Sequence, residues 1–413
     1  MTTEGPANTA SVIVTGRDRP ADLVRCMAAL RLQDHCLLEV VVVACPAGLA
    51  ALERAGLAAR VKSVAWTGGS VAAARNLGLR AAAGEVVAFL DNAAVPEPPW
   101  LSRLVAAFAD SRVEAATGFV RTRCGMRLRH RAAWVDVHGV ERPLVVDPAL
   151  PSLHQGAPGA GVRLWPATRA FRRETLAAIG GFDPAFTGRM DGADLELRLA
   201  AEEVITAVVP LAQVHPAGAT PHEAPAALGA DRAVFLRKHA PDVDPGAELA
   251  ALRAEGRAWA LRAMVAGRIE PRDVTTRLAA LEAGFAAGLG TEIAPLLPIA
   301  AAPAPFQPLP GTGPRPARTL VGGPWAARRL ARMARDATAD GAVVTVLRLS
   351  PTPLPRRMVF TDAGHWLQSG GLWARAAPAA DGQPGPLPLR PRARFRAEIT
   401  RIAAVRPVDT LLG

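Results

Sequence analysis

Three short and nearly uninterrupted apolar runs lie within the first 90 residues, at positions 11–14, 39–43 and 86–90. Runs of this length and composition are typical of strands buried on both faces of a parallel sheet. Helical signals separate them: Pro20 begins one helix, and Ser70 is placed to cap another. Strands that alternate with helices predict an α/β domain with a parallel sheet between two layers of helices.

A polar loop follows each of these runs, at residues 15–19, 44–48 and 91–94. Ligands of open α/β sheets bind beyond the carboxyl ends of the strands. We therefore expect the binding site where these three loops meet. The sequence has no GxxxxGK[ST] phosphate loop, no HExxH motif and no GxGxxG after a strand, so those three site classes are excluded.

The sequence changes character after this region. Periodicity predicts helices over 168–179 and 191–203 and a strand over 207–214. Further on, an Ala- and Leu-rich stretch predicts helices, and a Pro-rich stretch predicts a semi-rigid linker. The predicted organisation is an α/β domain over 8–245, a helical extension over 246–293, a linker over 294–317 and a small, mainly β, Arg-rich module over 318–413.

Charge is distributed unevenly along the chain. Residues 315–413 contain 16 Arg and six acidic residues, a net charge of +10 out of +11 for the whole chain. Such a charge favours anionic partners. The basic helix predicted over 324–336 suits peripheral contact with an anionic membrane, while the alternative is that its apolar side packs on the protein and its arginines are solvated. No aromatic stacking platform accompanies the charge, so no nucleic acid partner is expected.

Four cysteines without CxxC spacing make no disulfide framework, and no apolar run is long enough to span a bilayer. The first residues lack the basic segment of a secretory signal. These features predict a cytoplasmic protein, with the basic module at the inner face of the membrane.

Four residues stand out as candidates for chemistry. Asp91 directly follows a buried strand, where a carboxylate holds a divalent cation or a sugar hydroxyl, or caps a turn. Asp191 and Asp194 share one helix face, where paired acids supply a general base, or complement the helix dipole. His215 follows the predicted strand over 207–214 and is either a metal ligand or a structural histidine.

Five ordered blocks match a known pattern. They are SVIVTGRDRPADLVRCMAALRLQ from residue 11, ARNLGLRAAAGEVVAFLDNAAVPEPPWL from residue 74, AFRRETLAAIGGFDPAF from residue 170, DGADLELRL from residue 191, and VHPAGAT with FLRKHAP after it. Together they resemble the family 2 inverting glycosyltransferases, which have the GT-A fold. The resemblance covers a little over half of the chain.

The resemblance implies a nucleotide-sugar donor, a glycan or lipid-linked acceptor, and an aspartate base that deprotonates the acceptor hydroxyl. It implies Asp191 or Asp194 as that base, and Asp91 and His215 as neighbours of a Mn²⁺ or Mg²⁺ ion. It also implies a nucleotide-sugar site made by Thr15, Arg17, Arg75 and Asp91.

The sequence departs from the family pattern at three places. Ala93 stands where the family usually has a metal-binding carboxylate, and Ala44 and Cys45 stand where it usually has an aspartate. Gly192 occupies the commonest position of the base. These departures put the divalent cation in doubt, because a hard cation needs about six oxygen ligands.

Two functions follow from the same residues. The first is an inverting glycosyltransferase, of hexosyltransferase type, in glycan or cell-envelope polysaccharide synthesis. The alternative is a non-catalytic relative that binds a nucleotide or a glycan or scaffolds a partner.

Overall fold

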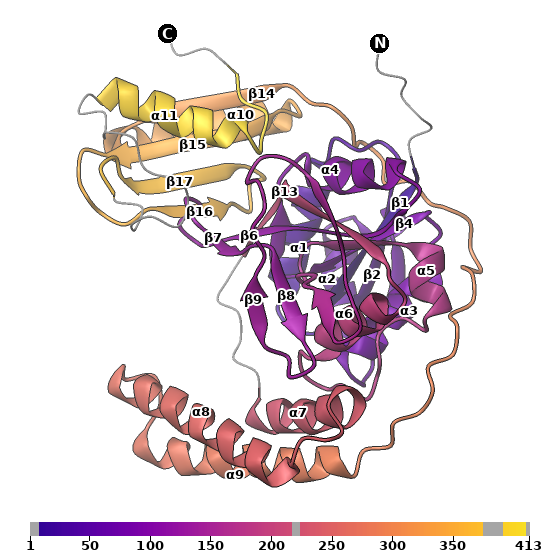
Figure 1. Cartoon of the computed structure of the whole chain (residues 1–413). Coiled ribbons are helices and arrows are strands. Elements are labelled where there is room, and N and C mark those ends of the chain that lie inside the picture. The colour runs from indigo at the N-terminus through magenta and orange to yellow at the C-terminus, as the bar shows by residue number, and fades with distance from the viewer. Residues whose placement is uncertain (1–7, 217–223, 375–390, 410–413) are drawn as a thin grey trace.

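The computed structural model describes residues 8–216, 224–374 and 391–409 (Figure 1). The three apolar runs form the parallel strands β1 (Ala10–Gly16), β2 (Leu38–Ala44) and β4 (Val86–Asp91), as expected from the sequence. In the sheet, Thr15 lies opposite Val43 of β2 and opposite Asp91 of β4. The polar ends of these strands therefore meet at one edge.

The N-terminal domain is built around one large mixed sheet with the strand order β10-β13-β6-β12-β4-β1-β2-β3. β5 pairs with β13, and β7 pairs with β6. A separate small sheet has the order β11-β8-β9. The remaining strands are β3 (Lys62–Ala65), β5 (Ala94–Pro96), β6 (Val113–Arg121), β7 (Leu128–His130), β8 (Ala133–Asp136), β9 (Glu141–Pro143), β10 (Ser152–Gln155), β11 (Ala160–Val162), β12 (Arg169–Arg172) and β13 (Ile205–Pro216).

Helices pack against both faces of this sheet (Figure 1). Ser70 caps α3, as expected, because its hydroxyl accepts a hydrogen bond from the backbone N–H of Ala73. The helices of this domain are α1 (Pro20–Leu30), α2 (Pro46–Arg54), α3 (Val71–Ala81), α4 (Trp100–Ala106), α5 (Arg173–Ala178), α6 (Asp191–Ala201) and α7 (Pro225–His239), with 3-10 turns at Ala58–Arg60 and Ala107–Ala109.

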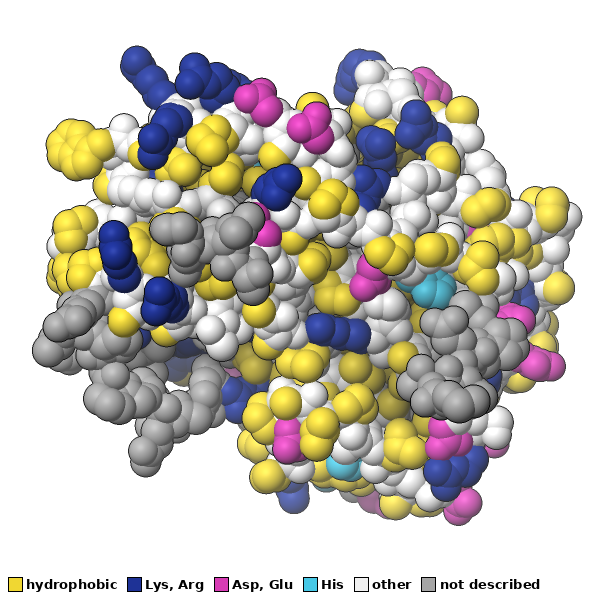
Figure 2. All heavy atoms as spheres, turned by 90° about the horizontal axis from the view of Figure 1, so that it is seen from above, with side chains coloured by type: hydrophobic (Ala, Val, Ile, Leu, Met, Phe, Trp, Pro, Cys, Tyr) yellow, Lys and Arg dark blue, Asp and Glu magenta, His cyan; other side chains and the backbone are white. Residues whose placement is uncertain are grey.

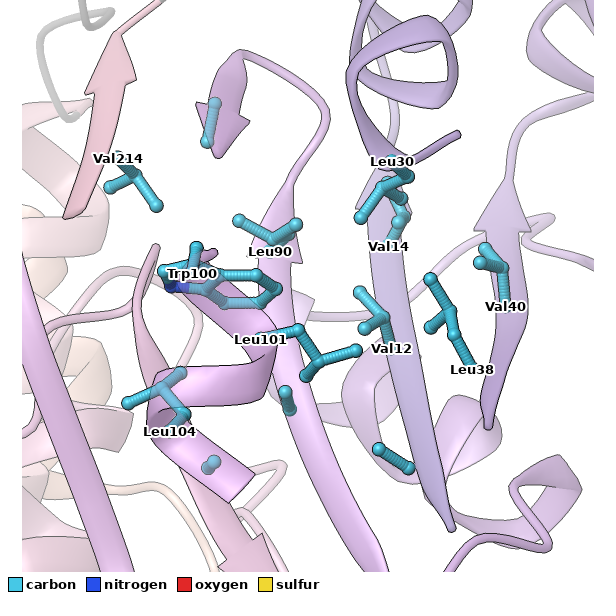
Figure 3. Packing of buried hydrophobic residues seen from close by; sticks show 14 of the residues in the cluster. Val12, Val14, Leu30, Leu38, Val40, Leu90, Trp100, Leu101, Leu104 and Val214 are labelled. Carbon is cyan, nitrogen blue, oxygen red and sulfur yellow. The ribbon is translucent and has the colours of Figure 1, made fainter. Parts of the chain in front are cut away.

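The largest core cluster fills one side of the sheet (Figure 3). Leu90 and Val12 lie on the side of Trp100 and Leu101 of α4, and Val14 lies beside Leu30 of α1. Trp100 of α4 is fully buried there, and its indole N–H donates to the Thr168 hydroxyl at 2.9 Å. Burying an aromatic side chain of this size with its N–H paired is among the larger single contributions to a core. This packing fixes the segment around β4, which carries Asp91.

The helix predicted over 168–179 is wrong in its first half. Residues Arg169–Arg172 form β12, which lies between β4 and β6 and pairs antiparallel with both. The helix α5 begins only at Arg173. The two neighbouring strands supply a full ladder of hydrogen bonds to this segment, and such tertiary pairing outweighs local helical preference.

The Pro-rich segment predicted as a linker lies along the N-terminal domain. The backbone N–H of Ile299 donates to the carbonyl of Ala177 at 2.9 Å, and that of Leu309 donates to Leu38 at 2.6 Å. Leu309 is buried in the main core. Before it, α8 (Pro245–Val265) and α9 (Pro271–Leu289) form the expected helical stretch, and α9 packs on α7.

The C-terminal module has a four-stranded sheet in the order β14-β15-β17-β16. Leu330 and Ala334 of its basic helix α10 pack against β15 of the same module. No helix among the described residues is long and apolar enough to cross a membrane. The elements are β14 (Ala317–Gly322), a 3-10 turn (Pro324–Ala326), α10 (Ala327–Ala339), β15 (Val343–Ser350), β16 (Arg357–Phe360), β17 (Trp366–Gly371) and α11 (Pro391–Ala403).

Candidate functional site

A cleft of about 550 Å³ opens at the carboxyl ends of β1 and β4. Its volume is in the range of small-molecule and cofactor sites. Six of the seven residues singled out from the sequence line it: Thr15, Arg17, Arg75, Asp91, Asp191 and His215. The remaining one, Asp194, does not line it. The fold thus brings together side chains from β1, α3, β4, α6 and β13.

Arg75 connects the two carboxylates of the cleft. Its guanidinium forms a buried ion pair with Asp191 and lies 3.7 Å from the carboxylate of Asp91. The Asp191 side chain is nearly inaccessible, whereas about half of the Asp91 side chain is exposed. One arginine therefore orients the acid at the bottom of the cleft and approaches the acid at its mouth.

Asp194 lies on α6, and its buried carboxylate is surrounded by the nitrogen atoms of three side chains. Its carboxylate lies 2.9 Å from Nε of Arg198, 2.5 Å from Nζ of Lys238 and 2.9 Å from Nε2 of His239. Burial raises the pKa of Asp194, but these partners outweigh it and lower the pKa to about 2. The ion pairs hold α6 against α7. This placement does not favour Asp194 as a base for a ligand in the cleft.

Gly192, at the position where a family base is common, faces away from the cleft lining. A Cβ there would lie 3.2 Å from Nη1 of Arg169 and 3.3 Å from Nη1 of Arg163, and neither arginine lines the cleft. Arg169 is fully buried over the ring of Phe182, and its guanidinium nitrogens have no hydrogen-bond partner. Burial lowers the pKa of Arg169 to about 9. Among these positions of α6, Asp191 is the acid that faces the cleft.

One ring nitrogen of His215 is hydrogen-bonded to Glu97, and the other is buried without a partner. Its Nε2 lies 2.7 Å from Oε1 of Glu97, and its Nδ1 is buried without a hydrogen-bond partner. Burial lowers the pKa of His215 to about 4, so the ring is neutral near pH 7. Glu97 was not predicted from the sequence, although it lies in the block that follows Asp91.

The described residues do not fit a divalent cation held by the protein. Asp91 offers one carboxylate, His215 offers only a buried nitrogen, and Ala93 offers no ligand. In the part of the chain that the structure describes, no group of three or more His, Cys, Asp or Glu side chains is arranged to hold a metal ion. Such an ion needs about six oxygen ligands.

Two aromatic side chains of the cleft were not predicted from the sequence. Trp66 follows β3, a short strand that the apolar pattern did not reveal, and the guanidinium of Arg17 lies 4.6 Å from the centre of its ring. Trp165 lies on the other side, stacked on His130 with ring centres 4.0 Å apart. Flat rings in a cleft of this kind suit nucleobases and sugar faces.

Among the described residues that line the cleft, arginines outnumber acidic side chains. There are five arginines and three aspartates. This balance favours an anionic ligand such as a diphosphate. Arg129 and Arg189 were not predicted from the sequence, because nothing in their local sequence distinguishes them from other surface arginines. The arginines are Arg17, Arg19, Arg75, Arg129 and Arg189.

Comparison with known proteins identifies one family. Residues 11–157 match the family model described as glycosyl transferase family 2. This match covers the strands and loops that carry Thr15, Arg17, Arg75 and Asp91. Together with the observed sheet it confirms the α/β, GT-A class of fold expected from the sequence. None of the curated protein sequences matches the chain.

Solved structures with similar folds share little sequence with this chain. One is described as a crystal structure of GalNAc-T7 with UDP, GalNAc and Mn²⁺, with 16% identity over 56% of this chain and 48% of that chain and a TM-score of 0.42. Another is TarS of S. aureus, with 19% identity over 56% of this chain and 39% of that chain and a TM-score of 0.39. The matched region thus spans about half or less of either protein.

Proposed function

We propose that this chain, whose residues 11–157 match the model of glycosyl transferase family 2, transfers a sugar, with inversion, from a nucleotide-sugar donor to an acceptor hydroxyl. The observation that carries this proposal is the linked set Asp91, Arg75 and Asp191 inside one cleft. We assign the reaction to glycan or cell-envelope polysaccharide synthesis, as the sequence resemblance implies.

The proposed reaction uses the residues of the cleft as follows. Asp191 takes the proton of the acceptor hydroxyl. The acceptor oxygen then bonds to the anomeric carbon, while the bond between that carbon and the diphosphate oxygen of the donor breaks. The leaving diphosphate gains negative charge, which the cleft arginines stabilise electrostatically. Arg75 contacts Oδ2 of Asp191, and we assign the proton transfer to Oδ1.

The alternative is a protein that binds a nucleotide or a glycan without turnover. The departure at Ala93 and the ion pair that engages Asp191 are the observations that favour it. Donor hydrolysis and transfer against a panel of nucleotide sugars, in Mn²⁺, in Mg²⁺ and in EDTA, distinguish the two. Binding without turnover under every condition would favour the alternative.

Asp91→Ala should weaken UDP binding by about tenfold, the scale of one hydrogen bond to a charged group. Asp91 lies at the mouth of the cleft, directly opposite Thr15 in the sheet. Isothermal titration calorimetry would measure the change, with Asp110→Asn as a control because Asp110 pairs with Arg112 outside the cleft. We expect wild-type binding to persist in EDTA. Unchanged affinity in Asp91→Ala would place the nucleotide elsewhere.

We also propose that the C-terminal module contacts anionic lipid. Leu330 and Ala334 of α10 pack inside the module, but Trp325 next to α10 is 99% exposed. Arg328, Arg329 and Arg332 of this helix are exposed as well. Figure 2 shows Lys and Arg side chains spread over one face of the molecule rather than gathered in a single patch. A modest, salt-sensitive attraction is therefore expected.

Replacing Arg328, Arg329 and Arg332 together by Gln should lower binding to phosphatidylserine vesicles at least tenfold. Each basic residue near an anionic surface contributes up to about 1 kcal/mol. Co-sedimentation at low salt would measure it, and a triple variant of exposed arginines on α8 and its following turn would match the change in charge. Equal pelleting of the two triple variants would contradict the proposal. The control positions are Arg257, Arg262 and Arg268.

A further inference from the structure

The C-terminal module meets the N-terminal domain directly behind one wall of the cleft. β5 pairs with the end of β13, and Ala94, His215 and Pro216 of this pair line the cleft. Glu97 follows β5, and its backbone N–H donates to the carbonyl of Gln213 at 3.0 Å. Whatever holds Glu97 therefore also holds this wall.

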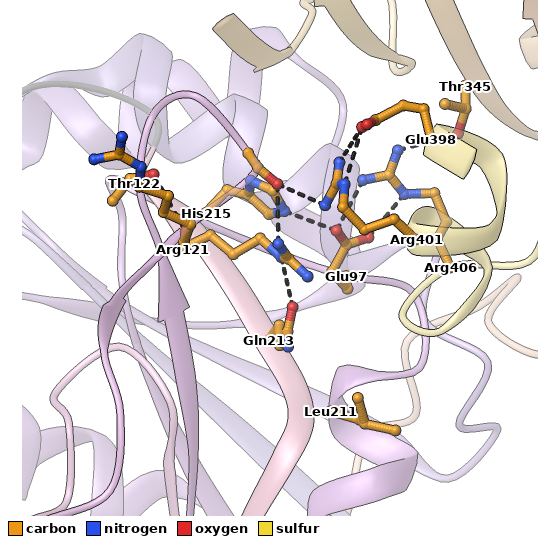
Figure 4. A network of polar contacts seen from close by, with 12 residues as sticks. Glu97, Arg121, Thr122, Leu211, Gln213, His215, Thr345, Glu398, Arg401 and Arg406 are labelled. Carbon is orange, nitrogen blue, oxygen red and sulfur yellow. Dashed lines mark hydrogen bonds and ion pairs between the residues drawn. The ribbon is translucent and has the colours of Figure 1, made fainter. Parts of the chain in front are cut away.

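Arg406 of the module forms a two-point ion pair with Glu97 (Figure 4). Both nitrogen–oxygen distances are 2.8 Å, and both side chains are only 1% exposed. Arg406 also donates to the Thr345 hydroxyl at 3.0 Å, and its guanidinium lies 3.9 Å from the centre of the Trp366 ring. Paired hydrogen bonds between charged groups are strong and fix the relative orientation of the partners.

The same carboxylate orients His215. A carboxylate paired with Arg406 is ionised and only accepts hydrogen bonds, so His215 donates to it from Nε2 at 2.7 Å. The Trp366 ring lies 4.7 Å from the imidazole, centre to centre. Arg121, a further charged side chain packed on this part of β13, donates to the Gln213 side chain. One residue of the module thus holds the acceptor that fixes the tautomer of His215.

Apolar side chains of the C-terminal module also pack against the N-terminal domain beside this ion pair. Met358 and Phe360 of β16 pack with Val95 of β5 and Ala29 of α1. Gly125 lies so close to the module that a Cβ there would come within 2.6 Å of the Met358 side chain, and its φ of 70° also suits glycine. The module is therefore packed against the site rather than tethered beside it.

We propose that Arg406 is a positioning residue of the cleft: acting through Glu97, it holds His215 and the β5–β13 wall in the arrangement that binds the donor diphosphate. The second half of this statement rests on the proposed function. The first half concerns only the described side chains and is testable without any nucleotide.

The first test is the tautomer of His215. In protein labelled with ¹⁵N-histidine and assigned with His215→Gln, NMR should show one neutral, Nε2-protonated ring in the wild type. Arg406→Met should lose that single state, and Arg406→Lys should retain it in part because the charge remains. Arg396→Met removes an exposed arginine of α11 in the same module and should leave the signal unchanged. An unchanged tautomer in Arg406→Met would overturn the proposal.

The second test is the affinity for UDP. Arg406→Met should bind UDP about tenfold more weakly than wild type, although Arg406 does not line the cleft, and Arg396→Met should bind as wild type does. Equal affinities would overturn the link between module and donor site. If the wild type binds neither UDP nor GDP, CDP or dTDP, the proposed function fails, and the tautomer alone decides the positioning role.

Arg406→Met leaves the buried carboxylate of Glu97 without its strongest partner, so it is prone to unfold. The double variant Glu97→Gln/Arg406→Met removes that charge and still offers His215 a carbonyl oxygen. It should fold, but because Arg406 no longer holds residue 97 in place, it should lack the single tautomer of the wild type. A double variant that folds and keeps the single Nε2-protonated tautomer would show that Arg406 is not needed to orient His215 and would overturn the proposal.

Discussion

Asp191→Asn should lower the turnover number by about 10²-fold or more, the scale expected for removal of a general base. The amide cannot take a proton at neutral pH, yet it keeps the shape of the side chain and an oxygen that accepts from Arg75. UDP affinity should therefore remain close to wild type. Steady-state kinetics with the best donor of the panel, together with calorimetry, would separate the two effects.

The control for this experiment is a second aspartate of the same helix, Asp194. Asp194→Asn makes the same chemical change one turn further along α6, outside the cleft lining. Its turnover per folded molecule should stay near wild type. An equal loss of turnover in both variants would indicate distortion of α6, and no loss in either would leave Asp191 with a structural role only.

The position of the cleft was predictable because the strands at whose ends it lies can each be recognised from one short stretch of sequence. The runs that became β1, β2 and β4 are apolar nearly throughout, and such strands form the centre of a sheet. Parallel pairing then places Thr15 beside Asp91 without further information. Thr15, Arg17 and Asp91 share the cleft for this reason, whereas Arg75, Asp191 and His215 reach it from α3, α6 and β13.

The partners of His215 were not predictable in this way. Glu97 and His215 are 118 positions apart, and Glu97 and Arg406 are 309 apart. Nothing local to any of them indicates a buried pair. The same reasoning applies to β12, where pairing with β4 and β6 decided the structure of Arg169–Arg172 against a local helical pattern. Asp194 was chosen for its spacing, but the partners of its carboxylate, Arg198, Lys238 and His239, became visible only in the folded chain.

Asp194→Asn should lower the free energy of unfolding by about 3 kcal/mol, at the lower end of the cost of removing one partner from a buried ion pair. The side chain is fully buried, and the substitution leaves Arg198 and Lys238 close together without the carboxylate between them. Lys238 keeps a second partner, Asp183 at 2.6 Å, which limits the loss. Urea unfolding followed by circular dichroism would measure it.

The pH dependence of this loss in unfolding free energy tests whether the charge of the Asp194 carboxylate causes it. Because the folded protein lowers the pKa of Asp194 from 3.8 to about 2, its contribution is fully present above pH 3.8 and disappears as the pH falls toward 2. The stability difference between wild type and Asp194→Asn should therefore be constant from pH 5 to 7 and shrink below pH 4. Asp110→Asn, at an exposed pair with Arg112, should show no measurable difference at pH 7. A loss that persisted undiminished at pH 3 would show that the carboxylate charge is not what holds α6 to α7.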